Sequence, residues 1–254
     1  MISIVILGSG TVAEHLLDTF LQYDAIVVKQ LIGRSEASIS SFTNKTLTSI
    51  GYHAIEEADV YIIAVSDDAI AEVAKKLAHK QGLVVHTSGS VPMQALLTKN
   101  RRGVFYPLQT FSPGKKIDFK SVPLCIEAEN QKDLKLLQQL AAVISDKVFE
   151  ISSEQRKSIH LAAVFVNNFT NHLFHIGREV CQENKVPFEV LLPLIKETVQ
   201  KLDQLSPYDA QTGPAKRNDS MTLERHQNQL DKKIYKDIYS LLSKSIKETY
   251  GQKL

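Results

Sequence analysis

The chain has 254 residues, of which 43% are hydrophobic and 23% are charged, a composition typical of a globular protein with one large domain or two ordinary ones. Because 30 basic and 28 acidic residues are interspersed and the formal net charge is only +2, we expect neither a nucleic-acid partner nor a membrane surface. The start lacks a signal-peptide pattern, and no apolar run reaches the ~18 residues that span a bilayer. The sequence therefore predicts a cytoplasmic protein.

Cysteine and histidine indicate neither a disulfide framework nor a metal site. Cys125 and Cys181 are far apart and lie in apolar or amphipathic surroundings, so we expect buried free thiols, as in a reducing compartment. His172 and His175 do not form a convincing metal-ligand pattern, and we expect no metal.

The first residues carry the most informative pattern in the chain. A run of β-formers, Ile2–Leu7, ends in a glycine-rich turn that opens a predicted helix over 11–22. The Gly-x-Gly-x-x-Gly/Ala spacing permits a tight turn and lets a pyrophosphate approach the backbone, where the helix N-terminus offers free amides. A plain strand-to-helix connection is the alternative. The residues predicted to hold the dinucleotide here are Gly8, Ser9, Gly10, Thr11 and Val12.

Up to about residue 151, apolar strand-like runs alternate with amphipathic helical stretches. This rhythm predicts an α/β fold of Rossmann type, with a mostly parallel sheet covered by helices on both faces. The stretch Asp67–His79, with apolar residues at helical spacing, is a good crossover helix. The predicted strands are 2–7, 26–32, 60–65, 83–86, 104–106, 122–126 and 147–151.

After Ser152 the pattern changes to long helices without strands. We therefore predict a dinucleotide-binding domain over 1–151 and a helical domain, for substrate binding and dimerisation, over 152–254. A first helix over 153–184 would be ~45 Å long at 1.5 Å per residue. Pro187 is expected to start the next helix, which ends at Ser206-Pro207 before a polar loop over 208–220. In the last helix an apolar stripe either packs internally or forms the interface of a homodimer.

The second strand indicates which dinucleotide is bound. NAD-binding units place an acid about 20 residues beyond the glycines, where it binds the ribose hydroxyls and repels a 2′-phosphate. Here the strand ends in Gly33-Arg34-Ser35 without an acid, and Arg34 with Ser35 suits an anionic phosphate. We therefore predict NADP, with NAD less favoured. A solvated loop cation is the alternative for Arg34, and Glu36 would spoil the site if it turned inward.

Polar residues also follow the later strands, at the sheet edge where ligands of such folds bind. We expect Val65 and Ser66 beside the cofactor, with Asp67 either next to them or serving only as a helix N-cap. Ordinary turn chemistry is the alternative reading of the next two strand ends. The residues there that we predict to orient a carbonyl or imine substrate are Ser88, Ser90 and Gln109.

The long helix carries a polar stripe. At about 100° per residue, Arg156, Asn167, Asn171 and Arg178 lie within about 40° of the meridian of His160. Because apolar residues flank the stripe, we expect a buried helix whose polar groups face a substrate pocket. His160 is then the candidate proton donor, with Asn167 in support. Structural hydrogen bonds between helices are the alternative.

The loop 212–219 is the other concentration of special residues. A turn there needs only Gly213 and Pro214, so Arg217 and Asp219 are surplus in a mere linker. We predict that Arg217 binds the substrate and that Asp219 acts in an acid-base relay. A solvated charged connection is the alternative.

Several motifs in order resemble a family of bacterial NADP oxidoreductases that join a Rossmann-like domain to a helical domain of unknown function (DUF2520). The resemblance covers nearly the whole chain. More distantly, the layout is similar to pyrroline-5-carboxylate reductase, ketopantoate reductase and the β-hydroxyacid dehydrogenases, in which a helical second domain closes the site and often forms the dimer. The resemblance implies a nicotinamide-linked reductase or dehydrogenase and names no substrate. The motifs are Gly8-Ser9-Gly10, His86-Thr87-Ser88-Gly89-Ser90, Pro107-Leu108-Gln109-Thr110-Phe111, Gln155-Arg156 with His160-Leu161-Ala162-Ala163 and Asn167-Asn168-Phe169, and Thr212-Gly213-Pro214-Ala215 with Arg217 and Asp219.

One departure from these relatives limits the mechanism. β-Hydroxyacid dehydrogenases carry a catalytic lysine four residues before an asparagine, whereas here Lys157 is followed at that spacing by Leu161. Either His160 is the acid or the chain has lost turnover. We predict an NADP-dependent oxidoreductase that moves a hydride between the nicotinamide and a small carbonyl or imine compound bound between the two domains. The alternative is a non-catalytic dinucleotide-binding sensor or scaffold, and residues alone do not distinguish a deazaflavin-linked enzyme.

Overall fold

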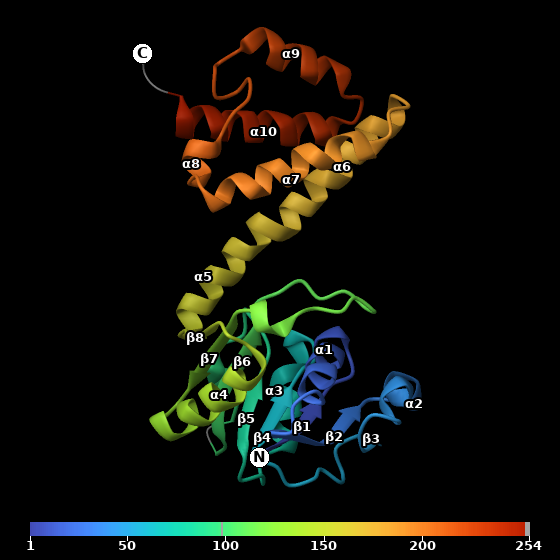
Figure 1. Ribbon diagram of the computed structural model, residues 1–254, viewed down its shortest axis with the longest axis vertical. Helices are drawn as coiled ribbons and strands as arrows, with labels where there is room; N and C mark the ends of the chain where they lie inside the picture. Colours follow the sequence, from blue (N-terminus) through green and yellow to red (C-terminus); the bar gives the residue numbers. More distant parts are fainter. Residues whose placement is uncertain (98, 252–254) are drawn as a thin grey trace. The chain divides into compact units, whose positions relative to one another are not determined.

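A computed structural model describes residues 1–97 and 99–251, which divide into two compact units, Met1–Asn167 and Asn168–Leu254 (Figure 1). The first unit contains an eight-stranded sheet with the strand order β3-β2-β1-β4-β5-β6-β7-β8. Neighbouring strands are parallel except β6 and β7, which pair antiparallel. The strands are β1 (Ile2–Leu7), β2 (Ile26–Gly33), β3 (Thr48–Ile50), β4 (Val60–Ile63), β5 (Leu83–His86), β6 (Arg101–Pro107), β7 (Leu124–Ala128) and β8 (Val148–Glu150).

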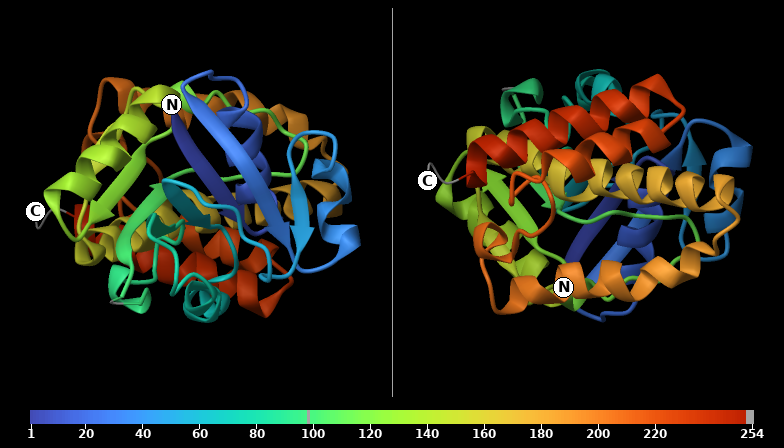
Figure 2. Two further views of the ribbon diagram at one scale, coloured as in Figure 1. Left: turned by 90° about the horizontal axis from the view of Figure 1, so that it is seen from below. Right: turned by 90° about the horizontal axis from the view of Figure 1, so that it is seen from above.

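The strand order confirms the predicted Rossmann-like fold class. From β1 the chain builds outward to β2 and β3 in one direction, then returns to add β4, β5 and β6 in the other. Ligands of such sheets bind at the carboxyl ends of the strands, where the order reverses. The sheet is visibly twisted in Figure 2. Sequence patterning did not find β3, because this three-residue edge strand has no buried residue and so leaves no apolar run.

Apolar residues cover both faces of the central strands. Along β1, Ile4 and Ile6 belong to one buried cluster, whereas Val5 and Leu7 belong to another on the opposite face. This double burial explains why β1 is a continuous apolar run. The helices of the unit are α1 (Thr11–Phe20), α2 (Glu36–Ile39), α3 (Ile70–Lys76) and α4 (Gln131–Ile144), with short 3₁₀ turns at Ser40–Phe42, Asp67–Ala69, Met93–Ala95 and Phe119–Ser121. Side chains of α1 and α4 fill the first cluster and those of α3 the second.

The predicted long helix is present but is not uniform. It consists of α5 (Ser153–Ala163), a π-helical segment (Val164–Phe169) and α6 (Thr170–Glu183). A π segment bonds residue i to i+5 instead of i+4, so the 100° rotation used to predict one polar stripe does not continue through Asn167. The first compact unit ends inside this segment, whereas the last strand ends at Glu150. The domain boundary between residues 151 and 152 therefore stays a prediction.

The second unit is entirely helical in the residues described. Besides α6 it contains a 3₁₀ turn at Phe188–Leu191, α7 (Leu192–Gln200), a 3₁₀ turn at Lys201–Asp203, α8 (Pro207–Ala210), α9 (Ser220–Gln229) and α10 (Lys233–Tyr250). The start of the predicted loop over 208–220 is wrong, because α8 occupies it: Ser206 accepts a hydrogen bond from the Asp209 amide as an N-cap, and Pro207 fits the first helical position. Across the described residues, no helix combines the length and apolar character needed to cross a bilayer.

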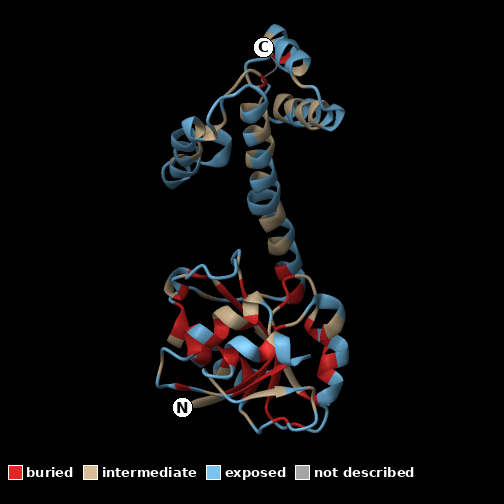
Figure 3. Cartoon of the chain, turned by 90° about the vertical axis from the view of Figure 1, so that its right-hand side faces the viewer, coloured by how far each residue is buried: buried red, intermediate tan, exposed pale blue. Residues whose placement is uncertain are grey.

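The expected burial of the long helix is wrong for this chain by itself. Only Ser153 and Arg156 are buried on α5, and α6 has no buried residue. Leu161 is 61% exposed and Val166 is 75% exposed. Figure 3 shows buried residues gathered around the sheet of the first unit, whereas the helices of the second unit are coloured mostly as exposed or intermediate. Apolar composition alone therefore does not bury a helix.

Burial on both faces of the sheet predicts how substitutions in its strands change the free energy of unfolding. Ile62 on β4 is fully buried, whereas Val27 on β2 is 39% exposed. We expect Ile62→Ala to lower the free energy of unfolding by about 2–5 kcal/mol, because it removes buried methyl groups and leaves a cavity. Val27→Ala, measured in the same urea titration, should cost well under half of that. Equal losses for the two variants would contradict the assigned core.

Candidate active site

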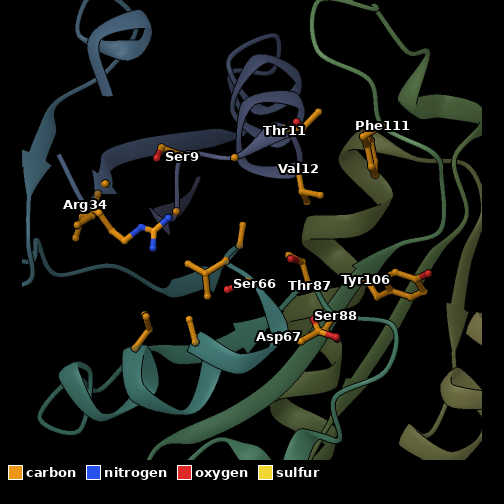
Figure 4. A pocket seen from close by; sticks show the side chains of 18 of the residues that line it. Ser9, Thr11, Val12, Arg34, Ser66, Asp67, Thr87, Ser88, Tyr106 and Phe111 are labelled. Atoms are coloured by element: carbon orange, nitrogen blue, oxygen red, sulfur yellow. The ribbon is translucent and has the colours of Figure 1, made fainter. Parts of the chain in front are cut away.

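A pocket of about 600 Å³ opens at the carboxyl edge of the sheet, and all of its lining residues belong to the first unit. The glycine-rich turn after β1, the end of β2 and one face of α3 line one part of it. The ends of β5 and β6 and the side chain of His160 line the other. In Figure 4, Arg34 and Tyr106 lie at opposite ends, with Ser66 between them. The volume is within the range of small-molecule and cofactor sites.

The glycine-rich turn has the geometry that an anion site requires. Gly8 has φ +129°, and a Cβ there would lie 2.0 Å from the carbonyl oxygen of Ala64, so only glycine fits between β1 and the end of β4. A Cβ on Gly10 would meet no atom within 4 Å. Gly10 is also the N-cap of α1 and gives it no side-chain cap. The first amides of α1 therefore face open pocket, where a helix N-terminus favours phosphate.

The two residues predicted to bind the 2′-phosphate lie in different surroundings in the structure. Arg34 lines the pocket at the end of β2. Ser35 instead precedes α2, where its amide binds Ser38 Oγ at 3.2 Å and its carbonyl oxygen accepts from the same hydroxyl at 2.7 Å. Glu36 lies in the exposed first turn of α2 and is not a lining residue.

Sequence reasoning missed several lining residues at this end. Lys76, Glu72, Val73 and Ala69 line the pocket from a single face of α3 and its preceding turn. Their i, i+3, i+4, i+7 spacing directly after a buried strand was a usable signal. Tyr52 also lines the pocket; burial raises the pKa of its phenol, and the charge of Arg34 opposes that shift.

Hydrogen bonds fix the loop that follows β5. Ser88 Oγ accepts from the amides of Ser90 and Val91, at 3.1 and 3.0 Å, and Ser90 donates its own hydroxyl to the carboxylate of Asp67. Ser88 lines the pocket, whereas Ser90 does not. Ser66, not Asp67, is the N-cap residue of the next turn, so the alternative of Asp67 as an N-cap is wrong. Asp67 anchors the loop.

His86 is a fully buried histidine at the end of β5. Its Nδ1 accepts a hydrogen bond from the Ser88 amide at 3.2 Å. Burial first, and then the positive charge of Arg156, lowers the pKa of His86 to about 4. A buried neutral imidazole therefore helps to hold the loop in place through this hydrogen bond.

A buried guanidinium attaches α5 to the same loop. Arg156 has no exposed surface and forms an ion pair with Glu127 on β7 at 2.6 Å. Its remaining nitrogens donate to the carbonyl oxygens of Ser88 at 3.1 Å and Val91 at 2.7 Å. Ser153 Oγ also donates to Glu127 at 2.8 Å. These contacts fix the first turn of α5, and with it His160 one turn later.

His160, predicted as the proton donor, lines the pocket. Its Nδ1 lies 3.3 Å from the hydroxyl oxygen of Tyr106, and the two rings meet edge to face. A Cβ on Gly89 would lie 2.5 Å from that Nδ1 and 2.8 Å from Cζ of Tyr106. Burial raises the pKa of the Tyr106 phenol. Sequence reasoning placed Tyr106 in a strand-end cluster but assigned it no individual role, and it did not foresee the need for glycine at position 89, because both depend on contacts across 54 and 71 residues of chain.

The remaining residues of the predicted site lie in different parts of the structure, and only some of them line the pocket. Val12, Val65, Ser66 and Gln109 line the pocket with Thr11 and Ser9. Asn167 is exposed in the π segment. Arg217 and Asp219 belong to the second unit, where Asp219 accepts from the Thr222 amide at 3.1 Å and caps α9. That hydrogen bonding lowers the pKa of Asp219.

The segment after β6 adds an aromatic wall through Phe111, which sequence reasoning placed in a motif without an individual role. Phe111 lines the pocket and contacts the His15 ring of α1, with 5.0 Å between ring centroids. Nε2 of His15 lies 3.1 Å from the Ser112 carbonyl oxygen. These contacts hold the segment against α1 beside the glycine-rich turn.

Comparisons with known proteins agree with this geometry. Residues 3–89 match the family model "NADP oxidoreductase coenzyme F420-dependent", and residues 122–246 match "Domain of unknown function (DUF2520)". The crystal structure of a "putative NADP oxidoreductase" from Bacteroides fragilis is 37% identical, with coverage of 97% of this chain and 98% of that one and a TM-score of 0.89. The chain belongs to this NADP oxidoreductase family. The predicted resemblance and the predicted NADP cofactor are thereby confirmed.

More distant relatives of this oxidoreductase share its fold. A reductive aminase from Aspergillus terreus, in complex with NADPH and ethyl levulinate, is 15% identical with a TM-score of 0.71, and the match covers 99% of this chain and 95% of that one. A 1-pyrroline-5-carboxylate reductase from Streptococcus pyogenes is 16% identical with a TM-score of 0.66 and 99% coverage of both chains. No curated protein matches the chain.

The neutral His86 makes the stability of the oxidoreductase depend on pH. The folded pKa of about 4 lies below the ordinary value of 6.5, so the unfolded state binds the extra proton in that window. As pH falls from about 6.5 to 4, the free energy of unfolding should drop by about 3 kcal/mol from this residue. Urea titrations at several pH values would measure the slope.

Two variants isolate this contribution. His86→Gln should flatten the pH dependence in that window, since no imidazole remains to be protonated on unfolding. His53→Gln, at an exposed position of the same unit, should retain the full slope. A His86→Gln protein with the unchanged slope would show that another group is responsible.

Proposed function

We propose that this protein catalyses hydride transfer between NADP(H) and a small carbonyl or imine compound. The carrying observation is one pocket with a phosphate-binding turn and Arg34 at one end and the His160–Tyr106 pair at the other. The names of the fold relatives, among them a reductive aminase and a pyrroline-5-carboxylate reductase, support this substrate class. Their low identity makes the substrate class a proposal.

The lining residues fit a dinucleotide phosphate. The uncapped start of α1 and the open space at Gly10 leave room for a pyrophosphate against Gly8, Ser9, Thr11 and Val12, with Val65 and Ser66 beside it. Arg34 would bind the 2′-phosphate, and Lys76 on α3 would add a second positive charge there. Ser35, predicted for this phosphate, would contribute from the start of α2. Glu72, an acid that also lines the pocket, is paired with Lys75 at 2.5 Å.

The opposite end would bind the substrate. When bound, the nicotinamide supplies or accepts the hydride. Ser88 and Gln109 would orient the reacting group, Ser90 would hold the loop through Asp67, and His160 would move the proton. That the helical unit closes over a substrate between the two domains, with Asn167 and Asp219 in the proton relay and Arg217 as a substrate clamp, is part of the same proposal. The two free cysteines support a reducing, cytoplasmic location.

Exchange of the charge at Arg34 tests the cofactor end. Arg34→Asp should weaken NADPH binding by about 10- to 100-fold, because it removes a charge-assisted contact and adds repulsion, and it should change NADH binding much less. The measurement is a fluorescence titration with each nucleotide. Lys132→Asp, with the same change of charge at an exposed position of α4, should leave both affinities unchanged. Equal weakening of NADPH and NADH by Arg34→Asp would remove Arg34 from the 2′-phosphate site.

Screening carbonyl and imine compounds for NADPH oxidation then tests the reaction. Turnover of such a compound is the expected result. Tight NADPH binding without turnover across the panel would favour the alternative of a dinucleotide-binding sensor or scaffold.

We also propose that the protein is a homodimer through its helical unit. Helices α6, α7 and α10 have no buried residue, and Leu241 of α10 is 69% exposed and Ile234 is 59% exposed. Monomeric soluble proteins rarely leave large apolar patches open to water, and a second copy would offer the same exposed apolar residues in return. The stripe of the last helix would then lie in the interface.

Sedimentation analysis tests this dimer. Leu241→Asp should raise the dissociation constant of the dimer at least tenfold, because a carboxylate would lose its hydration in an apolar interface. Leu47→Asp, at a leucine of the first unit that is 56% exposed, should leave the dimer intact. A wild-type protein that sediments as a monomer at micromolar concentration would contradict the proposal.

A further inference from the structure

The substrate end of the pocket contains a second titratable group besides His160. Tyr106 is half-buried near the end of β6, and its ring projects from the pocket wall beside Ser88 in Figure 4. Its hydroxyl oxygen is 3.3 Å from Nδ1 of His160, and both side chains line the pocket. Two hydrogen-bonding groups therefore meet where a substrate carbonyl or imine would be protonated.

The structure enforces this pair from three sides. Gly89 leaves the space that the two rings occupy, since a Cβ there would come within 2.8 Å of each. Arg156 fixes the loop that contains Gly89 to the first turn of α5, and α5 carries His160. Antiparallel pairing of Tyr106 with Cys125 on β7 fixes the backbone of the tyrosine. The contact is thus a consequence of the fold and not of two freely rotating surface side chains.

We propose that Tyr106 is a catalytic residue that donates the proton to the carbonyl oxygen or imine nitrogen of the substrate, with His160 supporting and refilling it through Nδ1. This inference rests on the function proposed above. A phenol can accept a hydrogen bond from His160 while it points its own proton at the substrate, whereas the Nδ1 that faces Tyr106 is occupied by that contact. The raised pKa of Tyr106 keeps the proton on the phenol through the neutral pH range.

The proton and electron movements balance in the direction of reduction. The substrate carbon receives the hydride with its electron pair, and the π pair of the C=O or C=N bond moves to oxygen or nitrogen. That atom forms a new bond to the phenol proton as the Tyr106 O–H bond breaks and its pair stays on the phenol oxygen. His160 then transfers the proton of Nδ1 to Tyr106, while Nε2 takes a proton from a water molecule, which leaves as hydroxide. Proton exchange with solvent then returns the imidazole to the tautomer that carries its proton on Nδ1. The enzyme returns to its starting charge.

Turnover of a compound found in the NADPH-oxidation screen gives the first test. Tyr106→Phe should lower kcat by about 100-fold or more, the range for loss of a general acid, with the NADPH dissociation constant unchanged. Gly89→Ala should also lower kcat with NADPH binding retained, because the added methyl group displaces the pair. Tyr23→Phe, outside the pocket, should match the wild type. A Tyr106→Phe enzyme within threefold of wild-type kcat would overturn the proposal.

A second test needs neither turnover nor cofactor. The ionisation of the Tyr106 phenol is followed by its absorbance at alkaline pH, and subtraction of the Tyr106→Phe titration assigns the signal. The midpoint of this titration should move to higher pH in His160→Phe, because the ionised phenol loses the hydrogen-bond donor that His160 supplies. An identical midpoint in the two proteins would show that His160 does not support Tyr106 and would overturn the proposed relay.

The two tests separate this inference from the proposed function. NADPH binding with wild-type turnover that survives Tyr106→Phe would remove only the role of Tyr106. A wild-type protein that does not bind NADPH would remove the proposed function, and the catalytic role of Tyr106 with it, while the titration would still report on the hydrogen-bonded pair.

Discussion

The buried guanidinium of Arg156 is the interaction on which the active-site geometry depends. It joins three elements that are distant in sequence. The guanidinium pairs with Glu127 on β7 and donates hydrogen bonds to two carbonyl oxygens of the loop after β5. Arg156 itself lies near the start of α5. A fully buried charge is costly unless it is paired and hydrogen-bonded, and one of the partners of Arg156, Ser88, lines the pocket. Because the buried charge needs all of these partners, it fixes the position of α5 relative to the loop after β5.

Two different kinds of electrostatics operate in the pocket. Around the glycine-rich turn the attraction comes from backbone amides and the cations Arg34 and Lys76, a pattern suited to phosphate. His160 and Tyr106 are hydrogen-bonding side chains in a half-buried setting, and the nearby His86 is held neutral by burial. If the proposed function is right, separation of phosphate binding from proton transfer would let each end of the pocket keep its own charge state.

The helical unit contrasts with the sheet unit in how it treats apolar surface. The sheet has helices on both faces and two closed apolar clusters, whereas the described residues of α6, α7 and α10 include none that is buried. Helical periodicity gives each of these helices an apolar face. Whether such a face becomes core or interface depends on whether another layer covers it, and a second copy is the covering layer that we propose.

The sequence by itself determined the fold class, the glycine-rich turn and the choice of NADP, because local spacing encodes these features: a buried parallel strand is a continuous apolar run, and the conformation at Gly8 excludes other residues. It also placed His160 and Gln109 among the site residues. Only the tertiary structure decided that Ser90 binds Asp67 and that Tyr106 meets His160 across Gly89. Those outcomes depend on the strand order, which brings the ends of distant strands and the start of α5 together, and contacts between residues far apart in the chain leave no periodic trace in it.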